Sequence, residues 1–195
     1  MLHRVCVFCG SSVGKSPEYR QAAEALAREL AERNIGLVFG GGCVGLMGII
    51  ADAVLTAGGT VTGVIPQSLV DREIAHRGLS DLRIVNSMHE RKALMAELSD
   101  GFIALPGGFG TFEEFCEVVT WTQLGLHRKR CGLLNVDGFY DPLLALFDRA
   151  VADGFIKPSN RELVVSHTDP AALLTALSAP LNAPEPKWIR NSEQT

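Results

Sequence analysis

The chain has 195 residues, 47% of them apolar and 21% charged, which is the composition and size of one ordinary globular domain. Its formal net charge of −4 argues against a nucleic-acid partner, because sequence-independent binding to nucleic acid depends on a basic surface. No uncharged apolar run reaches about 18 residues, so we expect no membrane span and no membrane partner.

Short apolar runs recur along the chain, and most of them are continuous rather than alternating. Continuous apolar runs are typical of strands that are buried on both faces of a parallel sheet. The predicted strands are, in chain order, Arg4–Cys9, Gly36–Phe39, Thr60–Ile65, Leu82–Val85, Phe102–Leu105, Cys131–Val136 and Leu163–Ser166.

Helical patterns fill the intervals between these runs. The first predicted helix follows Ser16-Pro17, a capping residue and the proline that the first helical position favours, and the second stops before Gly58-Gly59. The predicted helices are Pro17–Arg33, Leu46–Ala57, Glu90–Leu98, Phe112–Leu124, Pro142–Asp153 and Pro170–Leu177.

Alternating strands and helices predict an α/β fold of the Rossmann-like kind, with a mainly parallel central sheet and helices on both faces. We expect residues 1–178 to form a single domain of this kind. Residues 179–195 contain three prolines and end in polar residues, so they are expected to form a C-terminal tail.

The five cysteines are an odd number scattered through apolar runs, which favours reduced thiols in a cytoplasmic protein over a disulfide framework. Cys6 and Cys9 do form a C-x-x-C. We expect them to point to opposite faces of the sheet, because they are three residues apart on a strand. No second C-x-x-C or spaced pair of histidines completes a metal site.

Three of the loops that leave predicted strands are rich in glycine: CGSSVGKS, FGGGCVGLMG and LPGGFGTFEE. Each lies between a strand and a helix. Glycine lets the backbone approach a ligand closely, and the helix that follows presents unpaired N–H groups and its positive end to an anion. Three such loops at one edge of the sheet favour a ligand that carries phosphate over plain turns.

Two familiar phosphate sites fit the sequence poorly. A dinucleotide fold needs an acidic residue about 20 residues after its glycine loop, at the end of the next strand, but TVTGVI ends in Pro66-Gln67. The first loop, GSSVGKS, is one residue short of a P-loop and is followed at once by Pro17, so Lys15 is interpreted as a surface lysine.

Pro106–Glu114, with the sequence PGGFGTFEE, has two interpretations. In the first, Thr111 caps a helix and Glu114, three residues later, closes a capping box and has no further role. That interpretation leaves unexplained why the helix starts under a glycine loop at a strand end. In the second, Glu114 faces the ligand.

The pair Arg91-Lys92 is predicted near the start of the helix after the fourth strand. Cations are unfavourable there because that helix end is already positive. Their presence therefore suggests an anionic partner, either a ligand or a carboxylate. Glu73, within DREIAHRGL, is a third polar candidate at the same edge.

These segments together resemble the Lonely Guy family of cytokinin riboside 5′-monophosphate phosphoribohydrolases, whose bacterial members were once labelled possible lysine decarboxylases. The motif PGGxGTxxE is intact from Pro106 to Glu114, and M-x-x-R-K appears as Met88 to Lys92. The loop GGGxxGLMG matches from Gly40 to Gly48, and the likeness extends to about Leu177.

The resemblance implies a homodimer with active sites near the subunit interface, acting on a nucleotide substrate. Hydrolysis of such a substrate by a carboxylate calls for no metal or organic cofactor. The resemblance also implies that Arg91 and Glu114 are catalytic. The substrate-binding residues expected from the resemblance and from the glycine loops are Glu73, Lys92, Gly107, Gly108, Phe109, Gly110, Thr111, Thr120, Gly41, Gly42 and Gly45.

The resemblance predicts hydrolysis of the N-glycosidic bond of nucleoside 5′-monophosphates, with release of the free base and ribose 5-phosphate. Two rival functions are weighed against it. A non-catalytic module that binds AMP would share every feature except the chemistry of Glu114. A pyridoxal-phosphate decarboxylase would need a buried lysine, whereas Lys15, Lys92, Lys129, Lys157 and Lys187 are all predicted in loops, at helix starts or in the tail.

Overall fold

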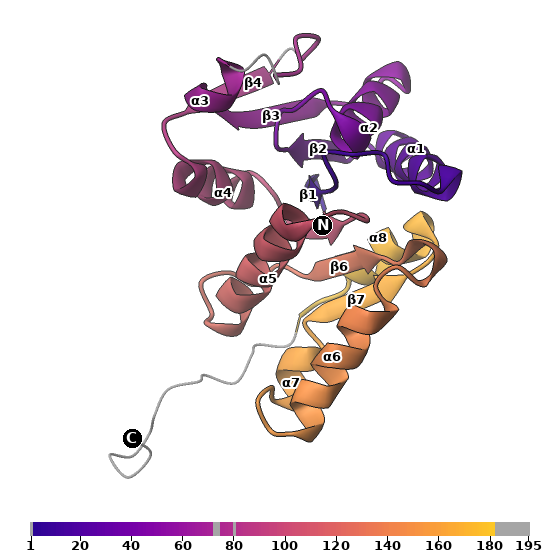
Figure 1. Cartoon of the computed structure of the whole chain (residues 1–195), viewed down its shortest axis with the longest axis vertical. Helices are drawn as coiled ribbons and strands as arrows, with labels where there is room; N and C mark the ends of the chain where they lie inside the picture. The colour runs from indigo at the N-terminus through magenta and orange to yellow at the C-terminus, as the bar shows by residue number, and fades with distance from the viewer. Residues whose placement is uncertain (1, 72–74, 80, 182–195) are drawn as a thin grey trace.

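The computed structural model describes residues 2–71, 75–79 and 81–181 (Figure 1). Seven strands form one sheet in the order β4-β3-β2-β1-β5-β6-β7, and every pair of neighbours is parallel. The strands are β1 (Arg4–Phe8), β2 (Gly36–Phe39), β3 (Val61–Pro66), β4 (Asp81–Val85), β5 (Gly101–Ala104), β6 (Cys131–Leu134) and β7 (Val164–His167). The predicted fold class is confirmed, and each predicted strand overlaps an observed one.

Helices connect the strands and cover both faces of the sheet. They are α1 (Pro17–Glu32), α2 (Gly45–Thr56), α3 (Gln67–Val70), α4 (Met88–Glu97), α5 (Phe109–Gln123), α6 (Asp141–Ala152), α7 (Pro158–Arg161) and α8 (Pro170–Ser178), with the 3₁₀ turn η1 (Val136–Gly138). The sequence did not predict α3, α7 or η1, because three or four residues are too few to show a helical period.

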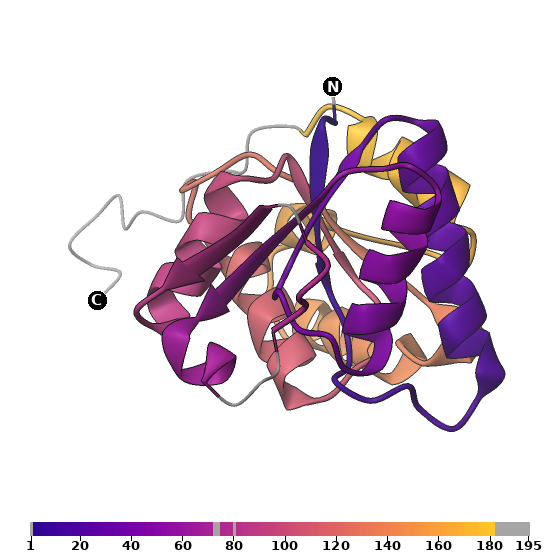
Figure 2. The ribbon, with the colours of Figure 1, turned by 90° about the horizontal axis from the view of Figure 1, so that it is seen from above.

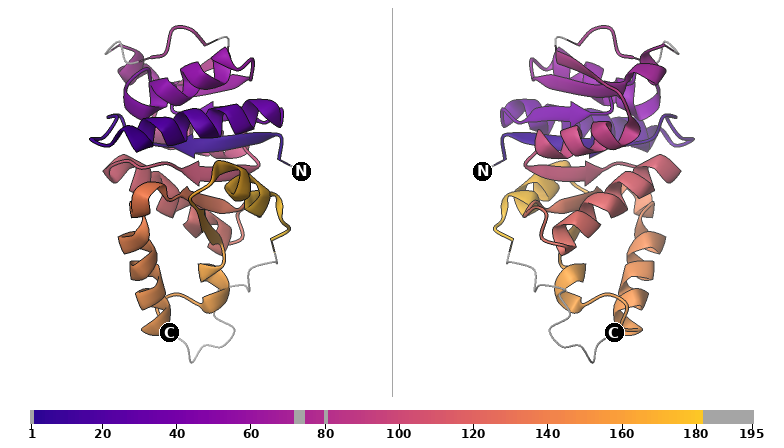
Figure 3. Two further views of the ribbon diagram at one scale, coloured as in Figure 1. Left: turned by 90° about the vertical axis from the view of Figure 1, so that its right-hand side faces the viewer. Right: turned by 90° about the vertical axis from the view of Figure 1, so that its left-hand side faces the viewer.

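The core has two layers, one on each face of the sheet. Side chains of α1, α2 and α8 pack on one face around Leu26, Ile50 and Leu174. Those of α4, α5 and α6 pack on the other around Met95 and Phe115. The two layers are seen from opposite sides in Figure 3, and Figure 2 shows α1 and α2 side by side.

The two cysteines of the C-x-x-C lie in different layers. Cys6 packs with the α4–α5 layer and Cys9 with the α1–α2 layer, which confirms that they point to opposite faces. Both are free thiols, and burial raises the pKa of each well above its usual value. A buried thiol of this kind is inert, so the motif serves packing.

The predicted start of α1 and the predicted end of α2 are confirmed. Ser16 caps α1 through a hydrogen bond from the backbone N–H of Glu18, and Pro17 is the first residue of the helix. Gly58, just after α2, has a φ of +79°, the left-handed conformation that ends helices. No helix in the described part of the chain is both long and apolar enough to cross a membrane.

Candidate active site at the carboxyl ends of β1 and β5

The loops after β1 and β5 meet because the order of strands reverses there: β1 continues to β2 on one side and neighbours β5 on the other. Ligands of open α/β sheets bind at such a switch point. The backbone N–H of Gly10 donates to the carbonyl of Pro106 at 3.1 Å, which joins the two loops. The first and third glycine loops therefore form one surface.

This surface is hollowed into two adjoining cavities that share Gly10, Ser11 and Gly108. One, of about 300 Å³, lies over the two loops and reaches Tyr19 and Phe139. The other, of about 280 Å³, contains the titratable groups. It is lined by Cys9, Gly10, Ser11, Met47, Met88, Arg91, Gly108, Phe109, Gly110, Thr111, Glu113 and Glu114.

The start of α5 forms one wall of this second cavity, and it differs from the capping-box interpretation. The helix begins at Phe109 with Gly108 as its N-cap, and no side chain caps it. Thr111 is therefore the third helical residue and Glu114 the sixth, so they form no capping box. The N–H groups of Phe109, Gly110 and Thr111 have no partner within the helix, and a helix end of this kind can bind an anion.

Gly108 and Gly110 have open space where a side chain would begin, with no atom within 4 Å of an added Cβ. Gly107 is different, because a Cβ there would overlap the Thr111 hydroxyl. Packing therefore requires a glycine at position 107, whereas Gly108 and Gly110 leave the backbone beside the cavity uncovered.

Arg91 is the fourth residue of α4, and its side chain is only 10% exposed. Its Nε donates to the carbonyl of Val64 at 3.1 Å, and its Nη2 donates to the carbonyl of Gly40 at 3.3 Å. A Cβ on Gly40 would overlap Nη2, so that glycine makes room for the guanidinium. The unfavourable position of a cation in the first turns of a helix is thus offset by two carbonyls and a carboxylate.

That carboxylate belongs to Glu114, whose Oε1 lies 3.6 Å from Nη1 of Arg91. This distance is an ion pair without a hydrogen bond. Burial raises the pKa of Glu114, the charge of Arg91 opposes that rise, and nearby Glu113 adds to it. Glu114 accepts no hydrogen bond from the described residues, so its oxygens remain available to water or to a ligand.

Lys92 and Thr120, two further predicted site residues, line neither of the two cavities. The ammonium of Lys92 contacts Glu113 and Glu117. Thr120 is exposed on α5 and donates to the carbonyl of Cys116 at 2.7 Å. Glu73 lies outside the described residues. Contacts of these three residues with a nucleotide stay predictions.

The second glycine loop, which follows β2, lines neither cavity with its glycines. Gly41 accepts a hydrogen bond from the N–H of His76 at 2.8 Å, and Gly42 forms a bridge with Ala75. Gly45 has a φ of +60° and packs directly on Ser11, so that α2 starts against the first loop. In this structure the loop supports Arg91 and α2, and substrate contact by Gly41, Gly42 or Gly45 stays a prediction.

The sequence-based site set omitted Ser11, Met47, Met88 and Glu113, which all line the second cavity. Ser11 had a signal, because it belongs to the first glycine loop. Met47 and Met88 carry no chemical signature of their own, and they reach the cavity only because α2 and α4 begin beside it.

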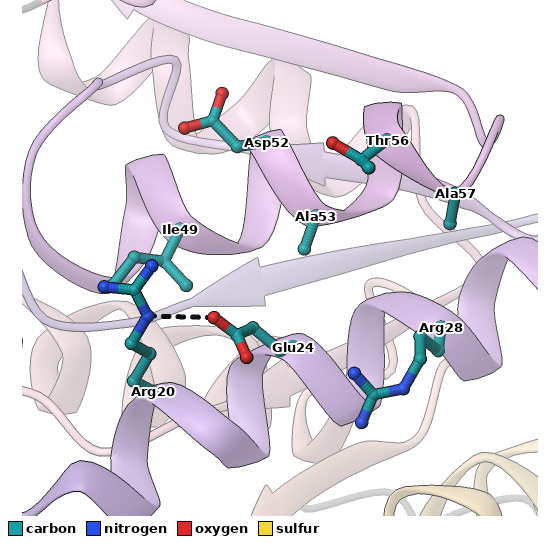
Figure 4. Close-up of a pocket in the computed structure, with 8 residues that line it drawn as sticks. All are labelled: Arg20, Glu24, Arg28, Ile49, Asp52, Ala53, Thr56 and Ala57. Carbon is teal, nitrogen blue, oxygen red and sulfur yellow. Dashed lines mark hydrogen bonds and ion pairs between the residues drawn. The ribbon is translucent and has the colours of Figure 1, made fainter.

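A third hollow, of about 490 Å³, lies between α1 and α2 (Figure 4). Figure 4 shows Arg20 paired with Glu24 one turn further along α1, and their nitrogen and oxygen are 2.8 Å apart. This groove is larger than either cavity, but it lies on the outer surface of two helices and away from the strand ends. We therefore place the candidate site at β1 and β5.

Fold and cavity together define a class: a Rossmann-like protein with an uncapped helix start and a carboxylate in one cavity. The family described as possible lysine decarboxylase matches residues 47–177. A probable cytokinin riboside 5′-monophosphate phosphoribohydrolase of Oryza sativa subsp. japonica is 58% identical over 174 residues, 89% of this chain and 77% of the relative. A cytokinin riboside 5′-monophosphate phosphoribohydrolase of Arabidopsis thaliana is 54% identical, over 89% of this chain and 80% of the relative.

The chain belongs to the Lonely Guy family of cytokinin riboside 5′-monophosphate phosphoribohydrolases, as the motifs around Arg91 and Glu114 predicted. Among solved structures it is similar to the molybdenum cofactor carrier protein of Chlamydomonas reinhardtii, with a TM-score of 0.66 and 21% identity, over 89% of this chain and 94% of the other. The protein TM1055 gives a TM-score of 0.67 at 24% identity, over 88% and 96%. These structures support the fold alone.

Replacing Glu114 by Gln should raise the free energy of unfolding at neutral pH, because burial makes the carboxylate costly to ionise. Since the folded-state pKa lies above the unfolded one, protonated Glu114 stabilises the fold, and that contribution is lost as pH rises through the raised pKa. The advantage of Gln should therefore disappear in acid. Thermal melts of both proteins at neutral and acidic pH measure it.

Glu162→Gln is the matched control. Because Glu162 is exposed, this variant and the wild type should have the same melting temperature at both pH values. A Glu114→Gln protein that melts below the wild type at neutral pH would contradict the expected cost of ionising Glu114.

Proposed function

We propose that the protein hydrolyses the N-glycosidic bond of nucleoside 5′-monophosphates, cytokinin nucleotides among them, and releases the free base and ribose 5-phosphate. The observation that carries this proposal is the position of Glu114: a mostly buried carboxylate beside Arg91, in a cavity that includes the uncapped start of α5. The names of the Oryza and Arabidopsis relatives agree with it.

The 5′-phosphate is assigned to the start of α5, where the backbone from Gly107 to Thr111 faces the two cavities. Free N–H groups and the positive helix end favour an anion there. Open space beside Gly108 and Gly110 lets phosphate oxygens approach the backbone. Binding the phosphate in this way would fix the ribose, so that remote binding energy serves the reacting carbon.

Glu114 would act on C1′ of the ribose. Cleavage of an N-glycoside passes through a sugar with oxocarbenium character, which a nearby carboxylate stabilises. The C1′–N bond breaks, its electron pair leaves with the base, and water supplies the hydroxyl on C1′. The same carboxylate can orient that water and take its proton, which finally passes to the base nitrogen that received the electron pair. A pKa above the usual value of a glutamate suits this task.

Arg91 is assigned to positioning and charge, because a guanidinium is effectively always protonated and is a poor general acid. Its backbone contacts hold it in one place, and its charge keeps Glu114 more readily ionised. A planar guanidinium with one nitrogen directed at Glu114 can also donate to a ribose hydroxyl.

The second candidate, a module that binds AMP without cleaving it, predicts that the wild type releases no base. The hydrolase proposal predicts a turnover that depends on Glu114. Glu114→Gln should lower the rate of base release by roughly 10²–10⁴-fold, the span of a positioned acid–base group. Chromatography of the free base released from AMP measures this rate. Near-normal turnover in the variant would remove Glu114 from the chemistry, and no release by the wild type would favour the binding module.

Phosphate recognition predicts that nucleoside 5′-monophosphates are cleaved and that unphosphorylated nucleosides are scarcely cleaved. AMP and adenosine differ only in the group assigned to α5, so their ratio of kcat/KM isolates its contribution. A screen with N6-substituted adenine nucleotides in the same assay identifies the preferred base. Equal rates for AMP and adenosine would contradict the assignment of the phosphate.

A homodimer is proposed as the working assembly, with each active site near the subunit interface. Large apolar side chains are exposed at both ends of α5, with Phe109 92%, Leu124 51% and Leu126 70% exposed, and exposed apolar patches mark interfaces. Light scattering after gel filtration should give twice the 21.0 kDa mass of the chain. The mass of a single chain at assay concentrations would contradict the dimer.

The remaining proposals concern organisation and location. Residues 1–178 are proposed to form one nucleotide-binding domain, with residues 179–195 as a tail, because a single sheet includes all seven strands. A cytoplasmic location is proposed from the five cysteines, which are all free thiols.

A further inference from the structure

Lys92 follows Arg91 directly in the sequence, yet the two cations have different surroundings. The Lys92 side chain is 11% exposed, and its Nζ lies 2.6 Å from Oε1 of Glu113 and 3.0 Å from Oε2 of Glu117. The contact with Glu113 is a hydrogen bond, whereas that with Glu117 is an ion pair without hydrogen-bond alignment. Lys92 lines neither cavity of the candidate site.

The two partners of Lys92 are four residues apart on α5 and therefore lie on one face of that helix. Glu114 is on the adjoining face, and it is paired with Arg91. Three carboxylates on about one turn and a half of α5 thus oppose two cations on α4. Without the Lys92 charge, two carboxylates next to Glu114 would lose their counter-ion.

The charges around Glu114 come from three elements. Arg91 and Lys92 of α4 favour its ionised form, whereas Glu113 and Glu117 of α5 oppose it. Cys6 and Cys9, in β1 and directly after it, are neutral buried thiols whose own pKa values the Glu114 charge helps to raise. For Lys92 itself burial lowers the pKa, but pairing with Glu113 and Glu117 outweighs burial and raises it, so Lys92 stays charged.

We propose that Lys92 is a positioning residue of the reaction, which acts on Glu114 by neutralising Glu113 and Glu117 and by tying α4 to α5. This inference rests on the proposed function of Glu114. It replaces the expected contact of Lys92 with the nucleotide, because an ammonium that two carboxylates already hold is not free for a phosphate.

The test is the pH dependence of AMP hydrolysis by the full-length chain, with kcat and KM measured separately. Lys92→Met removes the charge and keeps an unbranched side chain. If Lys92 acts through the carboxylates, the acidic limb of kcat/KM should move to higher pH, because Glu114 becomes harder to ionise. On the alkaline side of that limb, KM should stay within about twofold of the wild type.

A rescue variant separates this mechanism from substrate contact. Lys92→Met combined with Glu117→Gln removes one carboxylate together with the cation, so the acidic limb should move back toward that of the wild type. If Lys92 instead binds the nucleotide, KM should rise in the single variant, the limb should not move, and Glu117→Gln should restore nothing. That result would overturn the inference.

Glu117→Gln alone keeps the test decisive should Lys92→Met fail to fold. Glu117 lines neither cavity, and loss of its charge should move the acidic limb to lower pH. An unmoved limb would overturn the inference. The proposed function fails differently: the wild type would then release no base at any pH.

Discussion

The buried guanidinium of Arg91 is the interaction on which the candidate site depends. A cation that is 10% exposed has to be paired within the protein, and Arg91 is held by the carbonyls of Val64 and Gly40 and by the carboxylate of Glu114. These contacts bring together β3, the loop after β2, α4 and α5. Because the backbone fixes two of the guanidinium nitrogens, the third presents a charge at a defined place in the cavity.

The three glycine loops look alike in composition but serve different purposes in the fold. The loops after β1 and β5 meet at the switch point and form the walls of both cavities. The loop after β2 lies one strand away, where Gly40 admits Arg91 and Gly45 lets α2 start against Ser11. In the loops after β1 and β5, missing side chains leave space for a ligand. In the loop after β2, they leave space for other parts of the protein.

The chemistry of the site comes at some cost to the stability of the fold. Glu114 is placed where burial disfavours its charge, and α5 begins without a side-chain cap. Both features are unfavourable for the free protein, and both suit the anionic substrate and the positively charged transition state proposed for this site. One fold can carry unrelated ligands and chemistries. Function therefore lies in the residues of the site rather than in the sheet.

The sequence by itself determined the α/β class, the order of the long elements and the segments that carry Arg91 and Glu114. It could do so because buried parallel strands are continuous apolar runs and because loops at strand ends bind ligands. Tertiary structure decided what depends on neighbours distant in the chain. Thr111 resembles a helix cap, yet it packs against Gly107 and α5 begins earlier, at Phe109. Likewise, the pairing of Lys92 with two glutamates arises only when α4 and α5 lie together, and no spacing within either helix could predict it.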